Sequence, residues 1–404
     1  MNLTITIKSR LFVTDADVPK LKEVCEQYRL ACNHVSKWIF ENQFELNSNK
    51  VQKSVYDDCR TLFGLKSQMS SSVPKTVTAR YKTTQTQLSQ KPFRYQDENG
   101  KWQRTVKTLE WLWKPIQFKR PQADLVRNRD YSFVDNGETL SINTLGKRIK
   151  CKFSFQGIEG YLSDYTLGTA KLVESKGKWF LHISATKEVP DYDKESTTNV
   201  VGIDRGLRQL MTTYDSQGKT QFFSGKEVSK KRKHYKRLRT SLQERNTKSS
   251  KRRIRLMEQR ENRWMADVNH QMSKTLLSKY GPNTVFTLED LTGVRFVTEQ
   301  VSKKQRYEQV SWSFFQLEQF LNYKATMSGS QVVKVSAEYT SQRCPKCGKI
   351  HKEQRIKEIH EYHCSCGYKS NDDRIGAMNI QQLGTQWVSG TDERPRFEKL
   401  TVTA

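Results

Sequence analysis

Residues 199–210, with the sequence NVVGIDRGLRQL, decide how the rest of the chain is interpreted. The first five residues form a short apolar run with β-branched side chains, which predicts a buried strand. Asp204 follows directly, so a carboxylate stands at the end of this strand. Removing a carboxylate from water is costly unless a cation or hydrogen bonds compensate. Asp204 is therefore a candidate metal ligand, and the alternative is an acid that begins an ordinary turn.

Two more acids occupy comparable places. Residues 284–288 form a second apolar run, and Glu289 stands at its end. Asp373 lies at the start of a helix predicted near 371–380. Two acids on strands and one on a helix suit phosphodiester hydrolysis by two metal ions. Carboxylates bind Mg²⁺. Two such ions about 4 Å apart activate a water molecule and stabilise the leaving oxygen. Taken singly, each acid is also explained as a turn former or helix cap.

The position of Asp373 within its helix separates it from its neighbour. Asn371 or Asp372 can cap the helix. Asp373 then shares one face with Ala377 and Ile380, because helical neighbours recur every three or four residues. Asp372 is expected to face away and to serve as a cap.

Four of the eight cysteines are clustered in two close pairs. Cys344 and Cys347 form the first pair, Cys364 and Cys366 form the second, and sixteen residues separate the pairs. This spacing predicts a zinc ribbon, whose folding free energy would come largely from the metal because the segment has few apolar residues. Since only one residue separates Cys364 from Cys366, ligation by a neighbouring histidine, His351 or His363, is an alternative. A disulfide is the other alternative, which an intracellular setting disfavours.

The composition points to polyanionic partners. The chain has 70 Lys and Arg against 43 Asp and Glu, which gives a net charge of +27. Its length of 404 residues exceeds that of a usual single domain and predicts two to four structural units. Nucleic acid is favoured over a membrane surface, since no amphipathic anchor or apolar run of membrane length occurs. The first residues, MNLTITIKSRLFV, alternate as in a strand and lack a signal-peptide layout, so we expect an intracellular protein.

The most basic segment is 229–260, which contains fourteen Lys and Arg against two acids. A thin apolar stripe in this segment predicts two long helices. The density and single sign of the charge favour a surface that follows phosphates over a merely solvated face. The residues predicted to contact nucleic acid are Lys230, Lys231, Arg232, Lys233, Lys236, Arg237, Arg239, Lys251, Arg252 and Arg253.

The N-terminal half alternates between helical and strand patterns. Helices are predicted at about 18–44, 51–63 and 75–90, with a loop at 69–72. Short strands at 116–118, 131–134, 139–142, 149–155, 168–173 and 179–185 predict a small antiparallel barrel or sandwich, which the strand at 3–13 can join. Trp102, Trp111 and Trp113 are interpreted mainly as packing residues, with base stacking as the alternative.

The motifs of the C-terminal half resemble those of a known family. GIDRGL, LEDL, YTSQRCPKCG with HCSCGY, and NDDRIGAMNI are similar, in this order, to motifs of the transposon-associated TnpB nucleases and of the miniature type V CRISPR effectors. The resemblance covers roughly 199–380. It implies a multidomain fold, α+β and α/β: a β-barrel wedge domain at 1–13 and 115–195, a helical recognition insertion at 14–114, an RNase H-like RuvC nuclease domain at 196–338 and 369–404, and a zinc ribbon at 339–368.

The resemblance also implies roles and partners. Asp204, Glu289 and Asp373 would be the catalytic, Mg²⁺-binding acids, with a structural zinc on the four clustered cysteines. The partners would be a transposon-derived guide RNA, double-stranded target DNA next to a short flanking motif, and a co-encoded transposase, in a prokaryotic cytoplasm with nucleoid association. The family more often has Asn at Ile375 and Ala at Gly376, and Asp373 is preferred over Asp372 because it keeps the family's distance to Asn379.

Three alternatives to a transposon-associated nuclease follow from the same residues. A compact type V CRISPR effector would share the acids and the zinc ribbon. A nuclease-inactive, RNA-guided repressor would share the binding surfaces but lack the acids, all three of which are present. A guide-free enzyme of transposition would bind DNA without RNA, and RNA extraction from the purified protein would identify it.

Overall fold

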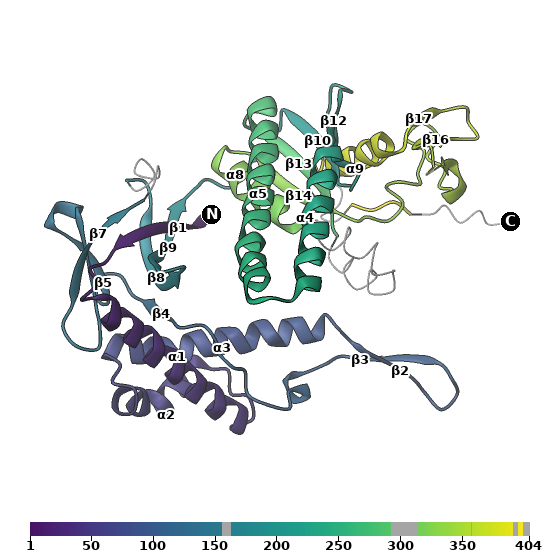
Figure 1. Cartoon of the computed structure of the whole chain (residues 1–404). Coiled ribbons are helices and arrows are strands. Elements are labelled where there is room, and N and C mark those ends of the chain that lie inside the picture. The colour runs from purple at the N-terminus through teal and green to yellow at the C-terminus, as the bar shows by residue number, and fades with distance from the viewer. Residues whose placement is uncertain (156–162, 292–313, 357, 391–394, 399–404) are drawn as a thin grey trace. The chain divides into compact units, whose positions relative to one another are not determined.

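The computed structural model describes residues 1–155, 163–291, 314–356, 358–390 and 395–398. The chain divides into two compact units, Asn2–Glu188 and Val189–Ala404, the second including Met1 (Figure 1). Both units combine helices with a sheet, so the fold is mixed α+β as expected. No helix among the described residues is long and apolar enough to cross a membrane.

The first unit is built on a seven-stranded antiparallel sheet of order β4-β8-β9-β1-β7-β6-β5. Its strands are β1 (Asn2–Phe12), β4 (Gln122–Leu125), β5 (Tyr131–Val134), β6 (Thr139–Ile142), β7 (Ile149–Ser154), β8 (Thr166–Ser175) and β9 (Lys178–Glu188). In β1 the buried residues Leu3, Ile7, Ser9 and Leu11 are all odd-numbered and share one face, as the period of two predicts. The Tyr131 hydroxyl donates to the Gly168 carbonyl at 2.6 Å. This bond ties β5, at one end of the order, to β8 near the other, so the sheet curls as a barrel does.

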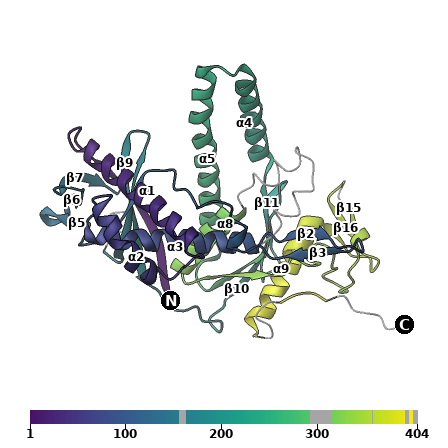
Figure 2. The same ribbon diagram turned by 90° about the horizontal axis from the view of Figure 1, so that it is seen from below.

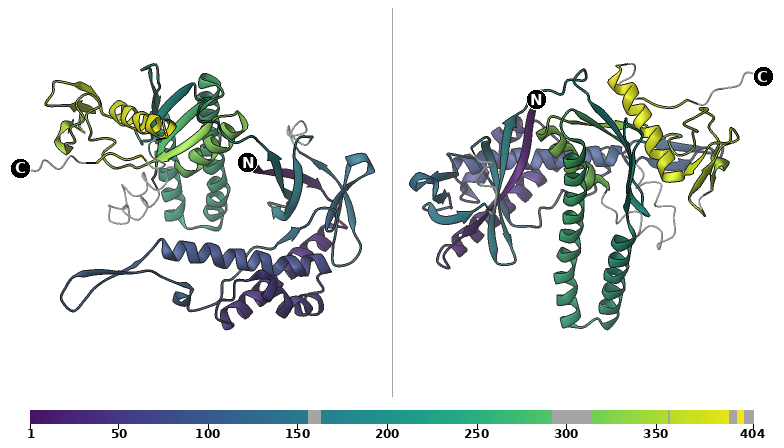
Figure 3. Two further views of the ribbon diagram at one scale, coloured as in Figure 1. Left: turned by 180° about the vertical axis from the view of Figure 1, so that it is seen from behind. Right: turned by 90° about the horizontal axis from the view of Figure 1, so that it is seen from above.

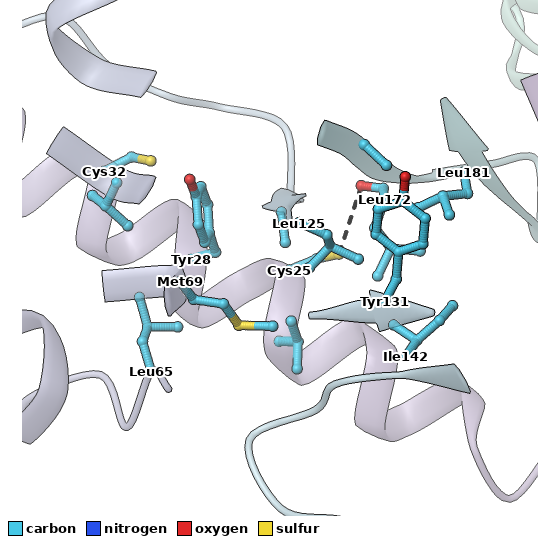
Figure 4. Close-up of a cluster of buried hydrophobic side chains, with 14 of the residues drawn as sticks. Cys25, Tyr28, Cys32, Leu65, Met69, Leu125, Tyr131, Ile142, Leu172 and Leu181 are labelled. Carbon is cyan, nitrogen blue, oxygen red and sulfur yellow. Dashed lines mark hydrogen bonds between the residues drawn. The ribbon is translucent and has the colours of Figure 1, made fainter. Parts of the chain in front are cut away.

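Helices α1 (Val18–Glu41) and α3 (Ser67–Ser89) pack on β4 of this sheet, and α2 (Ser48–Thr61) packs against these two helices. Figure 4 shows Tyr28 and Cys25 of α1 among side chains of the sheet, with the Cys25 thiol directed at the Leu172 carbonyl. The loop predicted at 69–72 is wrong, because α3 runs through it and through Pro74. Met69 is fully buried, so packing of the apolar face outweighs the hydrogen bond that proline cannot make.

The predicted strand at 116–118 is also wrong, and the structure shows why. The Phe118 N–H donates to the Asn33 side chain at 2.7 Å, and the Ile116 carbonyl accepts from the Ser36 hydroxyl at 2.6 Å. Backbone groups of this segment are therefore satisfied by side chains of α1, and no partner strand is needed. A hairpin absent from the predictions, β2 (Phe93–Gln96) with β3 (Trp102–Thr105), lies just before it.

The second unit contains a five-stranded sheet of order β12-β11-β10-β13-β14. The strands are β10 (Asn199–Asp204), β11 (Gln209–Tyr214), β12 (Thr220–Ser224), β13 (Thr284–Glu289) and β14 (Gln331–Val335). β10 and β13 are parallel to each other, as are β13 and β14, whereas β11 is antiparallel to both of its neighbours. The strands predicted at 199–203, 284–288 and 332–335, and the hairpin after Leu210, are confirmed.

Helices cover both faces of this sheet (Figure 3). α9 (Asp372–Val388) packs on one face, where Ile380 and Leu383 meet Val200 of β10. The other face contacts α5 (Lys248–Tyr280) and α8 (Phe314–Met327) through Val201 and Ile203. Alternate residues of β10 thus face different layers, and a strand buried on both sides explains its continuous apolar run.

The basic segment forms two antiparallel helices, α4 (Lys226–Arg245) and α5, which lie side by side in Figures 1 and 2. The predicted pair of long helices is confirmed, and α5 continues to Tyr280 as expected. The predicted helix at 311–327 appears as α8, while 311–313 lie outside the described residues. Three short strands, β15 (Arg355–Ile356), β16 (Glu361–His363) and β17 (Lys369–Asn371), form a separate small sheet beside the cysteine pairs.

The close approach of α9 to β10 depends on Gly202. A Cβ atom at this position would overlap the carbonyl oxygen of Ala377 and the backbone nitrogen of Gln381. We expect Gly202→Ala to lower the free energy of unfolding of this unit by about 3 kcal/mol, because backbone atoms cannot rotate away from an added methyl group. Chemical denaturation followed by Trp fluorescence measures the change. Gly146→Ala is the control, since a methyl group there would meet no atom within 4 Å, and equal stability of the two variants would contradict the expectation.

Candidate metal centres and nucleic-acid interface

Asp204 and Glu289 are the last residues of two adjacent parallel strands, β10 and β13. Ile203 is in register with Leu288, so the two acids that follow reach the same edge of the sheet. Strand alternation places Asp204 on the face of Val200, which α9 covers. The structure therefore brings two of the predicted acids to one edge and directs them toward one helix.

The N-terminus of α9 supplies the third acid at that edge. Asn371 caps the helix, accepting from the N–H groups of Asp373 and Arg374 at 3.1 Å each. Gly376, on the following turn, lies so close to β10 that an added Cβ would be 2.8 Å from an Asp204 carboxylate oxygen. Asp373 is partly buried one turn before Ala377, which is fully buried, as the helical spacing predicts.

Burial destabilises the charged forms of all three carboxylates, and for Asp204 the other two acids add to this effect. Desolvation, followed by the nearby Glu289 and Asp373 carboxylates, raises the pKa of Asp204 well above its usual value. Desolvation also raises the pKa of Glu289 and, together with Asp372, that of Asp373. Arg355 opposes all three shifts. Acids that repel one another in a partly dry site are stabilised in the ionised form by a bound cation.

The donor set fits a hard divalent cation, because it offers carboxylate oxygens and no sulfur. Gly376 leaves space beside Asp204 that a methyl group would fill. Within the described part of the chain, only the four clustered cysteines bring three or more potential metal-ligand atoms of His, Cys, Asp or Glu within 4.8 Å of one another. Asp204, Glu289 and Asp373 are therefore spaced more widely than the cysteines.

The expectation that Asp372 faces away is wrong. Its side chain is buried and accepts from the Arg355 guanidinium at 2.9 Å, with His360 3.6 Å away. Arg355 also lies 3.8 Å from Asp373, so one cation of β15 joins both acids at the start of α9. The helical pattern alone could not show this, because the partner that buries Asp372 comes from the small sheet of the cysteine segment.

Two positioning residues were not predicted. The Thr340 hydroxyl donates to a Glu289 carboxylate oxygen, and the Asn379 amide donates to the Thr340 carbonyl at 2.7 Å. Arg205 is buried against α8, pairs with Glu318 at 3.1 Å and donates to the Glu289 backbone carbonyl. Arg205 could have been proposed from the sequence, because it directly follows Asp204. Thr340 has no such signal, because its partner Glu289 is 51 positions away in the sequence.

The four clustered cysteines converge as predicted. The Cys344 and Cys366 sulfur atoms are 3.8 Å apart, and those of Cys347 and Cys364 are 3.5 Å apart. All four cysteines are free, and neither His351 nor His363 belongs to the cluster. His363 instead contacts Glu361 at 2.6 Å.

The electrostatics of this cluster also suit a metal site. Burial raises the pKa of the Cys344 thiol to about 12. Although desolvation acts to raise the pKa of Cys364, hydrogen bonds from the Cys366 backbone and neighbouring thiols lower it to about 7. Four sulfur ligands at this separation match a closed structural zinc site, in which thiolate ligands replace the thiols.

The basic helices present most of the predicted cations to solvent. Arg232 and Arg239 are exceptions, because both pair with the buried Glu261 and thereby join α4 to α5. Lys231 lies over the Trp264 ring at 4.4 Å, and Lys236 is partly buried. The residues that are exposed are Lys230, Lys231, Lys233, Arg237, Lys251, Arg252 and Arg253. A cleft of about 710 Å³ between the helices is lined by Tyr235 and Arg252, among others.

Two family models match the chain. Residues 182–292 match a model described as a probable transposase, and residues 314–380 match one described as the Cas12f1-like TNB domain. The CRISPR-associated endodeoxyribonuclease Cas12f1 of Sulfoacidibacillus thermotolerans is 28% identical over 240 residues, which are 54% of this chain and 53% of that protein. A TnpB-like protein of Methanocaldococcus jannaschii is 39% identical over 92 residues, covering 22% of this chain and 32% of that protein. The matched segments thus span about half the length of these relatives or less.

Solved structures resemble the chain over a greater length. A Cas12f1 complex with single-guide RNA and target DNA aligns over 94% of this chain and 98% of that chain, with a TM-score of 0.58 and 11% identity. The mini-RNA-guided endonuclease Cas_phi3 aligns over 98% of this chain and 93% of that chain, with a TM-score of 0.52 and 10% identity. At such identities the likeness concerns the fold.

The solved structures indicate a multidomain fold that mixes helices and sheets, as this chain's does. Over the matched segments the chain is similar to TnpB-like proteins and to Cas12f1.

The cysteine geometry predicts one zinc ion per chain. Cys364→Ser is expected to lose the zinc, because a hydroxyl is a poor substitute for a thiolate, and to unfold the ribbon at a lower temperature. Metal analysis of the purified protein, with a thermal scan before and after chelation, measures both effects. His363→Ala is the matched control and should keep its zinc; loss of zinc from that variant alone would identify a mixed Cys/His site.

Proposed function

We propose that the chain is an RNA-guided DNA endonuclease that hydrolyses phosphodiester bonds with two Mg²⁺ ions held by Asp204, Glu289 and Asp373. The observation that carries the proposal is the convergence of these three acids at one sheet edge, with raised pKa values. Structural ion-pair networks also shift pKa values, but here acids outnumber the cations that face them. The names of the relatives, which include an endodeoxyribonuclease, agree with this chemistry.

We assign the sheet of Val189–Ala404 to an RNase H-like, RuvC-type nuclease domain, with 339–368 as an inserted zinc ribbon. Its support is the strand order, in which three antiparallel strands precede two parallel ones and α9 covers one face. We likewise assign 1–13 and 115–195 to a wedge domain and 14–114 to a recognition domain. The barrel-like sheet and the three helices of the first unit are consistent with those assignments.

Each protein group at the proposed site has a distinct part. When bound, the ions would supply a nucleophilic water and stabilise the leaving oxygen. Asp204 and Glu289 hold ligand oxygens on the rigid ends of two paired strands. Thr340 fixes one Glu289 oxygen, and Arg205 fixes the Glu289 backbone. Arg355, at 2.9 Å from Asp372, holds the start of α9 so that Asp373 remains at the edge.

The proposed partners are a transposon-derived guide RNA and double-stranded target DNA with a short flanking motif. Their support is the charge of +27, the exposed cations of α4 and α5, and the single-guide RNA and target DNA that the similar Cas12f1 complex contains. A co-encoded transposase is a further proposed partner, and the site of action would be the cytoplasm and nucleoid of a prokaryote. The Cas12f1-like domain match favours one alternative, a compact type V CRISPR effector.

RNA that copurifies with the protein tests the proposal directly. Its sequence would reveal a guide segment and the genomic context, whether a transposon end or a CRISPR array. The protein loaded with this RNA should then cleave a matching DNA duplex in the presence of Mg²⁺. Protein that purifies without RNA yet binds DNA specifically would support the guide-free enzyme instead.

Charge removal at the acids should separate cleavage from binding. Asp204→Asn, Glu289→Gln and Asp373→Asn are each expected to slow cleavage by about 100-fold or more, because each loses a ligand charge that hydrolysis requires. Guide RNA and target DNA affinities should change little. Glu227→Gln, an exposed acid of α4, is the control for losing one carboxylate. Near-normal cleavage by any of the three variants would remove that residue from the site.

Charge reversal on the basic helices should change the salt dependence of binding. Each neutralised phosphate contributes about −0.9 to the log–log salt slope on duplex DNA and about −0.7 on single strands. Reversing the exposed Lys230, Lys233, Arg237 and Arg253 to Glu should therefore weaken binding and flatten the slope. Titrations at several salt concentrations, with guide RNA and target DNA separately, identify the polyanion. Unchanged affinity and slope, in a variant with normal helical circular dichroism, would indicate a surface that is only solvated.

A further inference from the structure

The hairpin of β2 and β3, together with the segment that follows it, displays large aromatic side chains to solvent. Trp113 is 81% exposed and Trp102 66% exposed, so the packing interpretation is wrong for both. The other members are Phe93, Tyr95 and Trp111, each more than two-fifths exposed. The hairpin extends away from α1, α2 and α3 (Figures 1 and 3). Clustered exposed aromatics of this kind mark interaction sites, because burying them against a partner removes apolar surface from water.

One side of the hairpin forms an aromatic platform. Phe93 and Tyr95 are two residues apart, so both project to the same side of β2. Their rings are nearly parallel, at 18° with centroids 6.1 Å apart, and the Trp111 ring lies 5.3 Å from Phe93. The Lys107 ammonium lies 5.5 Å from the Trp111 ring, which places a cation at the edge of the platform.

The opposite side of the hairpin has unsatisfied positive charge. Arg94 is directly opposite Arg104 in the ladder, and Gln96 is opposite Trp102. Like charges directly opposite each other destabilise a strand pair, unless an anion lies between them. Among the described residues, no ion pair or hydrogen bond engages either guanidinium. The nearby Asp97 is committed to the turn, where it accepts from the Lys101 N–H at 2.8 Å and from the Gln103 side chain.

The two sides together define the chemistry of the missing partner. Residues 91–114 contain six Lys and Arg against three Asp and Glu, interleaved with the five aromatics. Aromatic faces bind unpaired bases by stacking, and guanidinium pairs bind phosphates. A duplex offers phosphates but hides its base faces. A lipid surface would engage one plane, whereas aromatics and cations occur here on both sides of the hairpin.

We propose that this hairpin and the segment through Trp113 bind an unpaired stretch of RNA. Bases stack on Phe93, Tyr95 and Trp111, and the backbone passes between Arg94 and Arg104. The choice of RNA over DNA rests on the proposed function, since a target duplex has no unpaired bases until it is opened, whereas RNA loops are unpaired beforehand. This site consists of residues other than those of α4 and α5, and it uses base faces where those helices use phosphates alone.

The test compares full-length variants on an unstructured RNA of about 16 nucleotides, the same sequence as single-stranded DNA, and a duplex RNA. Replacing Phe93, Tyr95 and Trp111 together by Leu keeps the apolar surface and removes the π-faces. This variant should bind the single-stranded RNA about tenfold or more weakly, while duplex RNA binding stays unchanged. Arg94→Gln with Arg104→Gln should weaken binding and flatten the salt slope by about 0.7 per lost phosphate contact.

The outcomes separate this proposal from the proposed function. Unchanged RNA affinity in the Leu variant, or an equal loss on duplex RNA, would overturn the hairpin site whether or not guided cleavage occurs. A loss confined to single-stranded DNA would also overturn it, because the bound strand would then be DNA. If RNA affinity depends on the aromatic residues but the protein shows no guided cleavage, the hairpin site is supported and the proposed nuclease function is contradicted. The variants should melt as the wild type does, since the substituted side chains lie outside the buried core.

Discussion

The packing of α9 across β10 is the contact on which the candidate catalytic site depends. Packed layers of secondary structure normally stand about 10 Å apart. Here Gly202 on the strand has no side chain, so the backbone of the helix comes closer. The same approach brings Gly376 against the Asp204 carboxylate and Gly384 against Thr287. Because the helix begins at the sheet edge where β10 and β13 end, a helix-borne acid joins two strand-borne acids without any loop between them.

The gathering of acids is held together by contacts from the cysteine segment. Thr340 orients Glu289, and Arg355 balances the charge of Asp372 and Asp373. Asn379 of α9 donates to the backbone carbonyls of Thr340 and of Arg343, which directly precedes Cys344, at 2.7 and 2.8 Å. The cysteine segment and the acids are therefore joined in one hydrogen-bonded network, and loss of order in one is expected to reach the other.

Local patterns were sufficient where neighbours along the chain decide the outcome. Strand runs ending in Asp204 and Glu289, the helical pair of the basic segment and the cysteine pairs were all predicted from sequence and found in the fold. The failures share another cause: Pro74 lies inside a helix because distant residues bury its face, and Asp372 is buried because Arg355 reaches it from another sheet. The exposure of Trp102 and Trp113 likewise depends on tertiary position, which a run of residue types does not specify.

Gly376 and Gly384, on the face of α9 that packs on the sheet, also limit which sequence changes this protein can accept. A helix that slid by one residue along the sheet would place a side chain where Gly376 or Gly384 now leaves only hydrogen. The register of the helix is therefore locked at two points about two turns apart. Substitutions on the solvent side of α9 leave that register untouched. Sequence diversity, whether natural or from a laboratory library, should therefore accumulate on that outer surface, while Gly384 stays invariant among functional variants and Gly376 accepts nothing larger than the alanine that similar proteins have there.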